Sequence, residues 1–132
     1  MVNENPMNHD ALSQFANQQY LNLESFKRDG TAVQTPLWFA EDNGTLYVYT
    51  MAKAWKVKRI RRNPRVRITP CTMRGKVTGQ WVEAEAHIVD GTAAQHGQTL
   101  LLQKYGWMKQ VGNIFSRLMK RERIVMTINL KT

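Results

Sequence analysis

The sequence has one cysteine and no apolar run long enough to cross a membrane. Cys71 has no partner for a disulfide within the chain, and an isolated thiol is typical of a reducing compartment. No uninterrupted apolar stretch approaches the roughly 18–20 residues of a membrane-spanning helix. The N-terminal residues Met1 to Asp10 are polar and lack the apolar core of a secretory signal. We therefore expect a cytoplasmic protein with no membrane contact.

Signatures of catalytic side chains are also missing. The chain has no glycine-rich phosphate loop, no Gly-x-Ser-x-Gly elbow and no His-Glu-x-x-His or paired-cysteine metal motif. His9, His87 and His96 form no pair at metal-ligand spacing. Glu83 and Glu85 alternate on one strand face, a pattern that commonly serves only to hydrate a sheet. The sequence thus predicts no catalytic side chain and no metal site, so any redox chemistry would come from a bound cofactor.

Acidic residues are scarce relative to basic ones. The chain has 10 acidic and 19 basic residues, which gives a formal net charge of +9 at pH 7. Many of the cations gather in one short segment, namely Lys53, Lys56, Lys58, Arg59, Arg61, Arg62 and Arg65. Because the charge is concentrated, we expect a local anion site rather than a general contribution to solubility.

The hydrophobic pattern predicts a mainly β fold. The chain of 132 residues, 42% of them hydrophobic, is long enough to bury one core. Asp29-Gly30 and Asn43-Gly44 are typical of tight hairpins, and no long parallel crossover is visible. We expect a six-stranded antiparallel barrel with peripheral helices. The expected strands are Tyr20–Ser25, Ala32–Glu41, Thr45–Thr50, Arg65–Met73 (interrupted near Pro70), Trp81–Asp90 and Arg123–Leu130.

Helical patterns lie between and before these strands. Residues 1–18 are expected to form a helical N-terminal extension, and residues 19–132 a single domain. A basic helix is expected over Lys53–Asn63, ended by Pro64 because the residue before a proline avoids the helical region. A further helix is expected from Thr92 to Tyr105, followed by an amphipathic stretch from Val111 to Met119.

The start of the basic helix is the strongest candidate for a binding site. Lys53 and Lys56 lie at the positive end of the helix dipole, where cations are disfavoured unless an anion neutralises them. One hypothesis is a phosphate held by these two lysines together with Thr50 and Lys58. The alternative is a solvated basic face, which accounts for Lys58 and the arginines after it but not for Lys53 and Lys56.

The expected strand Ala32–Glu41 offers a second candidate. Pro36 cannot donate a ladder hydrogen bond, so it marks a strand edge or a bulge where backbone groups are free to meet a ligand. An ordinary edge proline explains it equally well. Trp38 shares a strand face with Gln34 and Pro36, so it is the best of the four tryptophans for lining a pocket for a flat aromatic ligand.

A succession of short segments is informative when taken together. They are Gly30-Thr31, Thr35-Pro36-Leu37-Trp38-Phe39, Leu46–Thr50, Lys56–Val66, Trp81–Ala84 and Lys104–Trp107. This succession resembles the pyridoxamine 5′-phosphate oxidase superfamily, near its branch of deazaflavin (coenzyme F-420)-dependent oxidoreductases. The resemblance covers nearly the whole chain beyond Gln19.

The resemblance implies a split β-barrel homodimer that binds FMN or a deazaflavin in clefts between its subunits. By position, Thr35, Pro36 and Leu37 would flank the ring, and Trp107 would close the pocket from the partner chain. Thr50, Lys56 and Lys58, with Lys53 as an addition, would hold the phosphate. Trp55 departs from the small or glycine-containing turn of relatives, so it would either narrow the phosphate pocket or stack on the ligand.

Three functions are compatible with these features. The first is an oxidoreductase that uses FMN or a deazaflavin on a small-molecule substrate. The second is a non-catalytic flavin- or haem-binding protein on the same barrel. The third is a nucleic-acid-binding module that uses the basic helix; it is the weakest, because the aromatic residues lie on strands rather than among the cations.

Overall fold

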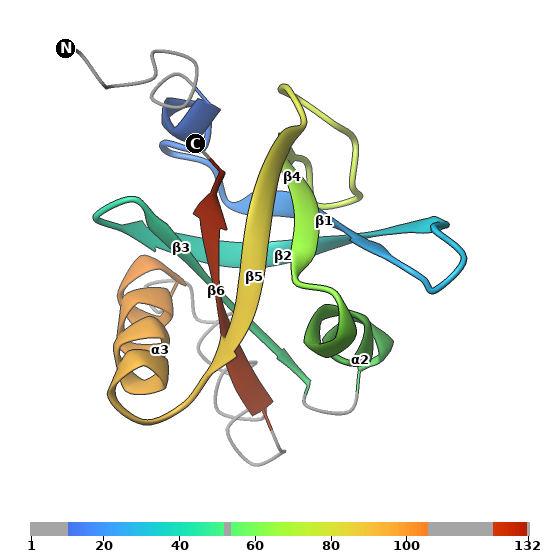
Figure 1. Ribbon diagram of the computed structural model, residues 1–132. Helices are drawn as coiled ribbons and strands as arrows, with labels where there is room; N and C mark the ends of the chain where they lie inside the picture. The colour runs from blue at the N-terminus through green and yellow to red at the C-terminus, as the bar shows by residue number, and fades with distance from the viewer. Residues whose placement is uncertain (1–10, 52–53, 106–122, 132) are drawn as a thin grey trace, which may run out of the picture.

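The computed structural model describes residues 11–51, 54–105 and 123–131 and confirms the predicted fold class. Six antiparallel strands close into a barrel in the order β1-β2-β3-β6-β5-β4, with β4 returning to β1 (Figure 1). The helices α2 and α3 pack on different sides of this barrel. The bounds are β1 (Tyr20–Phe26), β2 (Ala32–Asp42), β3 (Thr45–Met51), α2 (Trp55–Arg62), β4 (Arg65–Cys71), β5 (Val82–Val89), α3 (Gly91–Tyr105) and β6 (Arg123–Leu130).

Both predicted hairpins form at glycines with positive φ. Gly30 has φ +89° in the β1–β2 turn, a conformation that costs glycine little. In the β2–β3 turn, Asn43 and Gly44 have φ of +51° and +84°, the two consecutive positive values of a tight hairpin turn. These turns fix the register of the first three strands and with it which side chains face the barrel interior.

The barrel interior is a continuous apolar core. Alternate residues of each strand point inward, as a period of two requires. Leu12 and Leu37 are partly buried against this core. Its buried members on the strands are Leu21, Leu23, Phe39, Leu46, Val48, Val66, Ile68, Ala84, Ala86, Met126 and Ile128.

The outer face of β1 is buried as well as its inner face. Asn22 and Glu24 are both only 3% exposed. The loop after β4 covers Asn22, whose side-chain amide donates to the carbonyl of Gly75 at 3.2 Å. Glu24 accepts hydrogen bonds from Arg67 and, at 3.1 Å, from Gln34. For Glu24 these partners replace the lost water, whereas the Oδ1 atom of Asn22 has no hydrogen-bond partner among the described residues.

Strands β2 and β3 diverge part-way along their length. β2 pairs with β1 from Ala32 to Trp38, whereas its pairing with β3 covers only Phe39–Asp42. Among the described strands, the Ala32–Trp38 half of β2 therefore pairs on one side alone. Pro36 lies in this half, so it belongs to a free strand edge, one of the two positions expected for it.

Several element boundaries differ from the expectation. Helix α2 begins at Trp55, after an extended Ala54, and Lys53 lies outside the described residues. It ends as predicted before Pro64, with Asn63 extended. β4 is not interrupted at Pro70, which pairs with Leu21 of β1. The pairing of β4 with β5 ends at Ile68, so Pro70 lies beyond the part of β4 that pairs with both neighbours. The segment from Val111 to Met119 lies outside the described residues.

The N-terminal segment is described from residue 11 onward. Residues 11–13 are helical, and a turn follows in which Asn17 has φ +62°. Phe15 is buried and packs edge-on against Phe39 of β2, with ring centroids 5.8 Å apart. The proposed boundary at residue 18 stays a prediction. No helix among the described residues is long and apolar enough to cross a membrane.

Candidate functional site

A cavity opens where β2 and β3 diverge; we call it the fork cavity. The pairing ends at Phe39 of β2 and Val48 of β3. Beyond this pair the strands separate like a fork, with Trp38 on one side and Tyr49 on the other. The cavity has a volume of about 340 Å³. Its lining residues are Tyr20, Pro36, Leu37, Trp38, Tyr49, Met73 and Leu101.

The free edge of β2 supplies the three predicted residues in this cavity. Pro36, Leu37 and Trp38 line it together, although they alternate between the two faces of the strand. Both faces can contribute because, among the strands that the structure describes, none pairs with this edge. Thr35, the fourth predicted ring neighbour, is half-buried opposite Leu23 of β1 and is not among the lining residues.

Aromatic stacking holds Trp38 in place. Its ring stacks on Tyr105 of α3, with centroids 5.4 Å apart and planes inclined by 22°. The Tyr105 hydroxyl is 2.6 Å from the carbonyl oxygen of Gln19 and 2.7 Å from that of Phe39, and it accepts the Phe39 amide at 3.2 Å. Burial raises the pKa of Tyr105, so the hydroxyl stays protonated and can donate. The last turn of α3 thus fixes the fork.

Sequence reasoning missed four lining residues of the fork cavity. Tyr49 had a detectable signal, since it alternates with buried Val48 and must point outward. Met73 comes from the loop after β4, and Leu101 from α3, so only the tertiary fold brings them here. Tyr20 lies on the outer face of β1, beside Trp38.

Lys56 is the second residue of α2 and retains an uncompensated charge. The first turn of α2 contains no acidic residue, and Ala54 offers no capping side chain. Among the described residues, Lys56 forms no ion pair. Partial burial, and secondly the charge of Arg59, lower the pKa of Lys56. A cation that is disfavoured in this way would be stabilised by an anion at the helix start.

The other predicted phosphate ligands differ in how the structure describes them. Lys58 lies about 200° further around α2, and its ammonium is 4.5 Å from the centre of the Trp55 ring. Thr50 is buried on β3 opposite Ile124. Lys53 and Trp107 lie outside the described residues, so their roles stay predictions, as do those of Thr50 and Lys58.

A short stretch of chain leads from one wall of the fork cavity to the start of α2. Tyr49 lines the cavity, β3 ends at Met51, and α2 begins at Trp55. The end of β3 and the start of α2 are thus neighbours in the chain.

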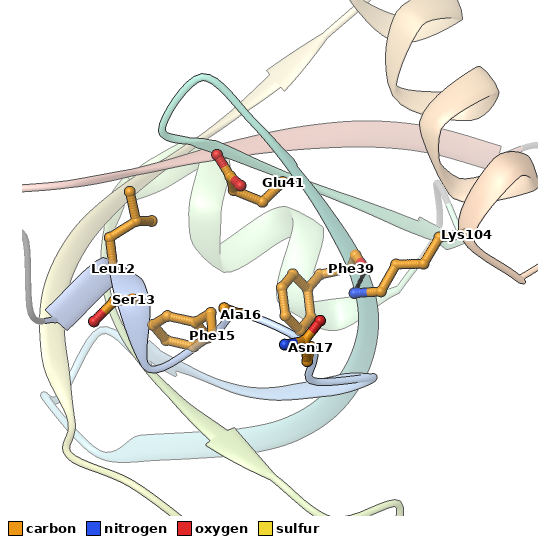
Figure 2. A pocket seen from close by; sticks show the side chains of 8 residues that line it. All are labelled: Leu12, Ser13, Phe15, Ala16, Asn17, Phe39, Glu41 and Lys104. Carbon is orange, nitrogen blue, oxygen red and sulfur yellow. Dashed lines mark hydrogen bonds between the residues drawn. The ribbon is translucent and has the colours of Figure 1, made fainter.

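A second cavity lies between the N-terminal segment, β2 and α3 (Figure 2). It has a volume of about 320 Å³, and Phe15, Phe39, Glu41 and Lys104 are among its lining residues. The Lys104 ammonium donates to the carbonyls of Gln18 at 2.6 Å and Phe39 at 2.8 Å. Burial lowers the pKa of Lys104 to about 8. These contacts attach α3 to β2 at the fork.

The described histidines lie away from the fork cavity. His96 bonds Asp42 at 2.7 Å, and His87 lies 3.3 Å from Glu85. Glu83, in turn, pairs with Arg65 at 3.1 Å. The two glutamates of β5 therefore bridge neighbouring side chains at the barrel surface.

The family model of pyridoxamine 5′-phosphate oxidase matches residues 8–130. The chain belongs to the pyridoxamine 5′-phosphate oxidase family. The match spans the fork cavity and Lys56, and it confirms the resemblance drawn from the sequence. A comparison with curated protein sequences finds no match.

Several solved structures share the fold of this chain. A conserved hypothetical protein of Mycobacterium tuberculosis is 20% identical, with a TM-score of 0.70 over 100% of this chain and 82% of its own. The haem storage protein HutZ of Vibrio cholerae is 13% identical, with a TM-score of 0.70 over 99% of this chain and 92% of its own. General stress protein 26 of Bacillus anthracis is 20% identical, with a TM-score of 0.62 over 94% of this chain and 88% of its own. At these identities the likeness concerns the fold alone.

Proposed function

We propose that this protein binds FMN, or alternatively a deazaflavin, and acts as an oxidoreductase on a small molecule. The ring would occupy the fork cavity and the phosphate would bind at Lys56. The observation that carries the proposal is the uncompensated, partly buried charge of Lys56 at the start of α2. A phosphate there would neutralise Lys56 and accept the unpaired amides of the first helical turn.

The residues of the fork cavity fit a flavin ring. Ligand cavities typically measure about 300–1,000 Å³, and this one reaches about 340 Å³ within a single chain. Trp38 and Tyr49 offer aromatic surface, while the free edge of β2 offers backbone donors and acceptors to the polar edge of the ring. A bound flavin would supply the hydride chemistry. The chain's own part would be to orient the ring, anchor the phosphate and exclude water.

A homodimer would complete this site. Met73 lines the fork cavity yet is 65% exposed, so the cavity is open on that side. Met51, at the end of β3, and Leu102, on α3, are further exposed apolar residues. Covering such residues is a common role of subunit contacts. Trp107 of a second copy is the predicted cover. Sedimentation of the purified protein as a dimer is the expected result, and a strict monomer would contradict this part.

Haem binding is the second candidate. It is favoured by the fold shared with the haem storage protein HutZ. The described lining of the fork cavity contains no histidine, so an iron ligand there would have to be Tyr20, Tyr49 or Met73. This composition favours a flavin over haem.

Absorption titrations distinguish these functions. The purified protein is titrated separately with FMN, a deazaflavin and haem, and then tested for electron transfer to an acceptor once the flavin is reduced. We expect FMN or the deazaflavin to bind with a shifted visible spectrum. A haem Soret shift without flavin binding would instead support haem storage. Flavin binding without turnover of any donor or acceptor would support a non-catalytic carrier.

A further inference from the structure

A larger basic cavity lies on the other side of α2, between this helix and the β1–β2 hairpin; we call it the hairpin cavity. Its volume is about 630 Å³. It shares no lining residue with the fork cavity, and Lys56 is not part of its lining. The lining residues are Lys27, Arg28, Val33, Trp55, Arg59 and Arg62.

The charge of the hairpin cavity is positive throughout. Four of its lining residues are cations and none is acidic, and among the described residues none of the four forms an ion pair. The nearby carboxylate of Asp29 accepts the Thr31 amide at 2.9 Å within the hairpin turn. Its pKa is lowered mainly by hydrogen bonds from Thr31 and in smaller part by the charge of Lys27. The four lining cations exceed this single negative charge, and such an excess favours an anionic ligand.

Two of the guanidinium groups are held in fixed positions. Arg59 donates from Nε to the Ser25 hydroxyl at 2.8 Å, and Arg62 donates to the Phe26 carbonyl at 3.0 Å. Each of these contacts uses one of the five N–H donors of a guanidinium, so donors remain for a ligand. Arginine in this state is suited to phosphate, because its planar fork matches two phosphate oxygens.

Trp55 adds an aromatic surface to the same cavity. Trp55, Arg59 and Arg62 are spaced four and three residues apart, so they lie along one stripe of α2. The Trp55 side chain is exposed, at 72% of its residue surface. The Lys58 ammonium lies over the ring, 4.5 Å from its centre, which leaves one face of the indole for a flat ligand.

We propose that the hairpin cavity binds a nucleotide, with its base stacked on Trp55 and its phosphates on Arg59, Arg62 and the hairpin cations Lys27 and Arg28. The combination of an exposed indole with four unpaired cations supplies both halves of such a ligand. Phosphate alone would leave Trp55 unused, and an uncharged ring would leave the cations unused. This site does not depend on the proposed flavin site.

Calorimetric titration with three probes tests the proposal. The probes are ADP, pyrophosphate and adenosine, which present both halves, the phosphates alone and the base alone. We expect ADP to bind about tenfold or more tightly than pyrophosphate, because stacking on an aromatic side chain contributes at that scale. We expect adenosine to bind weakest. Equal affinity for ADP and pyrophosphate would overturn the stacking role of Trp55.

Two variants and one control localise the binding. Trp55→Ala should reduce ADP affinity to that of pyrophosphate and leave pyrophosphate binding unchanged. Arg62→Gln should weaken both, whereas Lys131→Gln, which removes one positive charge at the exposed end of β6, should weaken neither appreciably. Because Trp55 and Arg62 are exposed, both variants should fold, which circular dichroism can verify. An equal loss from Arg62→Gln and Lys131→Gln would show a general charge effect and refute the site.

Competition separates this site from the flavin site. Saturating ADP should leave FMN affinity unchanged, since the two cavities share no residue. Direct competition would show that the hairpin cavity belongs to the flavin site, which contradicts the proposal. Binding of a single-stranded oligonucleotide without binding of ADP would also refute it, in favour of nucleic acid.

Discussion

The ring of Trp38 stacks on the ring of Tyr105, with centroids 5.4 Å apart and planes inclined by 22°. This contact joins the wall of the fork cavity to the last turn of α3. The Tyr105 hydroxyl also forms hydrogen bonds with the backbone of Phe39, the residue of β2 at which pairing with β3 begins. The geometry of the fork therefore depends on a residue that does not line the cavity.

Replacing Tyr105 by phenylalanine isolates the hydroxyl from the ring. Tyr105→Phe keeps the stacking surface but leaves the buried amide of Phe39 without its acceptor. We expect the free energy of unfolding to fall by about 1–3 kcal/mol, as measured by urea denaturation. Tyr47→Phe is the matched control, since Tyr47 is only half-buried on the outside of β3, and it should change stability by less than about 0.5 kcal/mol. Similar small losses in both variants would contradict this role of Tyr105.

The sequence predicted the barrel because its strands and turns have strong local signals. Alternating strands such as β3 and β6 and the Asn43-Gly44 turn leave little choice of register. The burial of Glu24 could not be predicted, because it depends on Arg67 from another strand. The barrel order, in which β6 is inserted between β3 and β5, likewise depends on long-range pairing.

The candidate site was predictable only where one strand carries it. In the sequence, Pro36 indicated a strand edge or a bulge, and Trp38, on the same strand, was the best candidate for lining a ligand pocket. Both residues line the fork cavity. Met73 and Leu101 reach the same cavity from a loop and a helix that are distant in sequence, and no local pattern reports such a meeting. The sequence already set Lys56, at the helix start, apart from Lys58, which a solvated basic face explains; the structure adds that helix geometry turns the two to different sides.

A charge reversal at Lys56 tests the phosphate site. Lys56→Glu places a carboxylate where the flavin phosphate is proposed to bind, and we expect FMN affinity to fall by at least about tenfold. Lys58→Glu carries the same change in net charge on the opposite side of α2 and should have a smaller effect. Fluorescence titration of FMN measures both. Equal losses would indicate a general field effect, and unchanged affinity in Lys56→Glu would refute the phosphate assignment.

The buried amine of Lys104 predicts a pH dependence of stability. Its pKa is lowered from 10.5 to about 8 in the folded chain, so between these values the unfolded state binds more protons. The free energy of unfolding should therefore rise with pH across this window, relative to a variant that cannot titrate. Lys104→Met removes the ammonium, which lies 3.9 Å from the centre of the Phe39 ring, keeps a long apolar side chain and serves as that reference. Urea unfolding at pH 7, 8, 9 and 10 provides the measurement, and a constant difference between the two proteins would contradict the prediction.

The Glu24–Arg67 pair predicts that stability also depends on pH in the acid range. The hydrogen bond from Arg67 is the main cause that lowers the pKa of Glu24 below 4.5, so this pair stabilises the fold at neutral pH and less as acid protonates Glu24. Arg67→Met should cost about 2 kcal/mol at pH 7, and this loss should shrink between pH 5 and pH 3. Arg65→Met breaks the exposed pair with Glu83 and should cost less than about 1 kcal/mol. A loss from Arg67→Met that is independent of pH would assign its effect to packing instead.

Gly97 shows where helix propensity and packing oppose each other. It lies inside α3, where an alanine would normally stabilise a helix by about 1 kcal/mol. Here a Cβ atom would lie 2.8 Å from a methyl carbon of Val125 and 2.9 Å from the ring of Tyr47, closer than real contacts allow. Both neighbours belong to packed strands and cannot withdraw as a flexible side chain would.

We therefore expect Gly97→Ala to lower the free energy of unfolding by about 1–2 kcal/mol, despite the gain in propensity. Thr99→Ala on the exposed side of the same helix is the matched control, and it should be neutral or slightly stabilising. Urea denaturation of both variants gives the comparison. A stabilised Gly97→Ala protein would mean that α3 can move away from β3 and β6, and then the contacts of Lys104 and Tyr105 could not hold the fork as rigidly as the structure indicates.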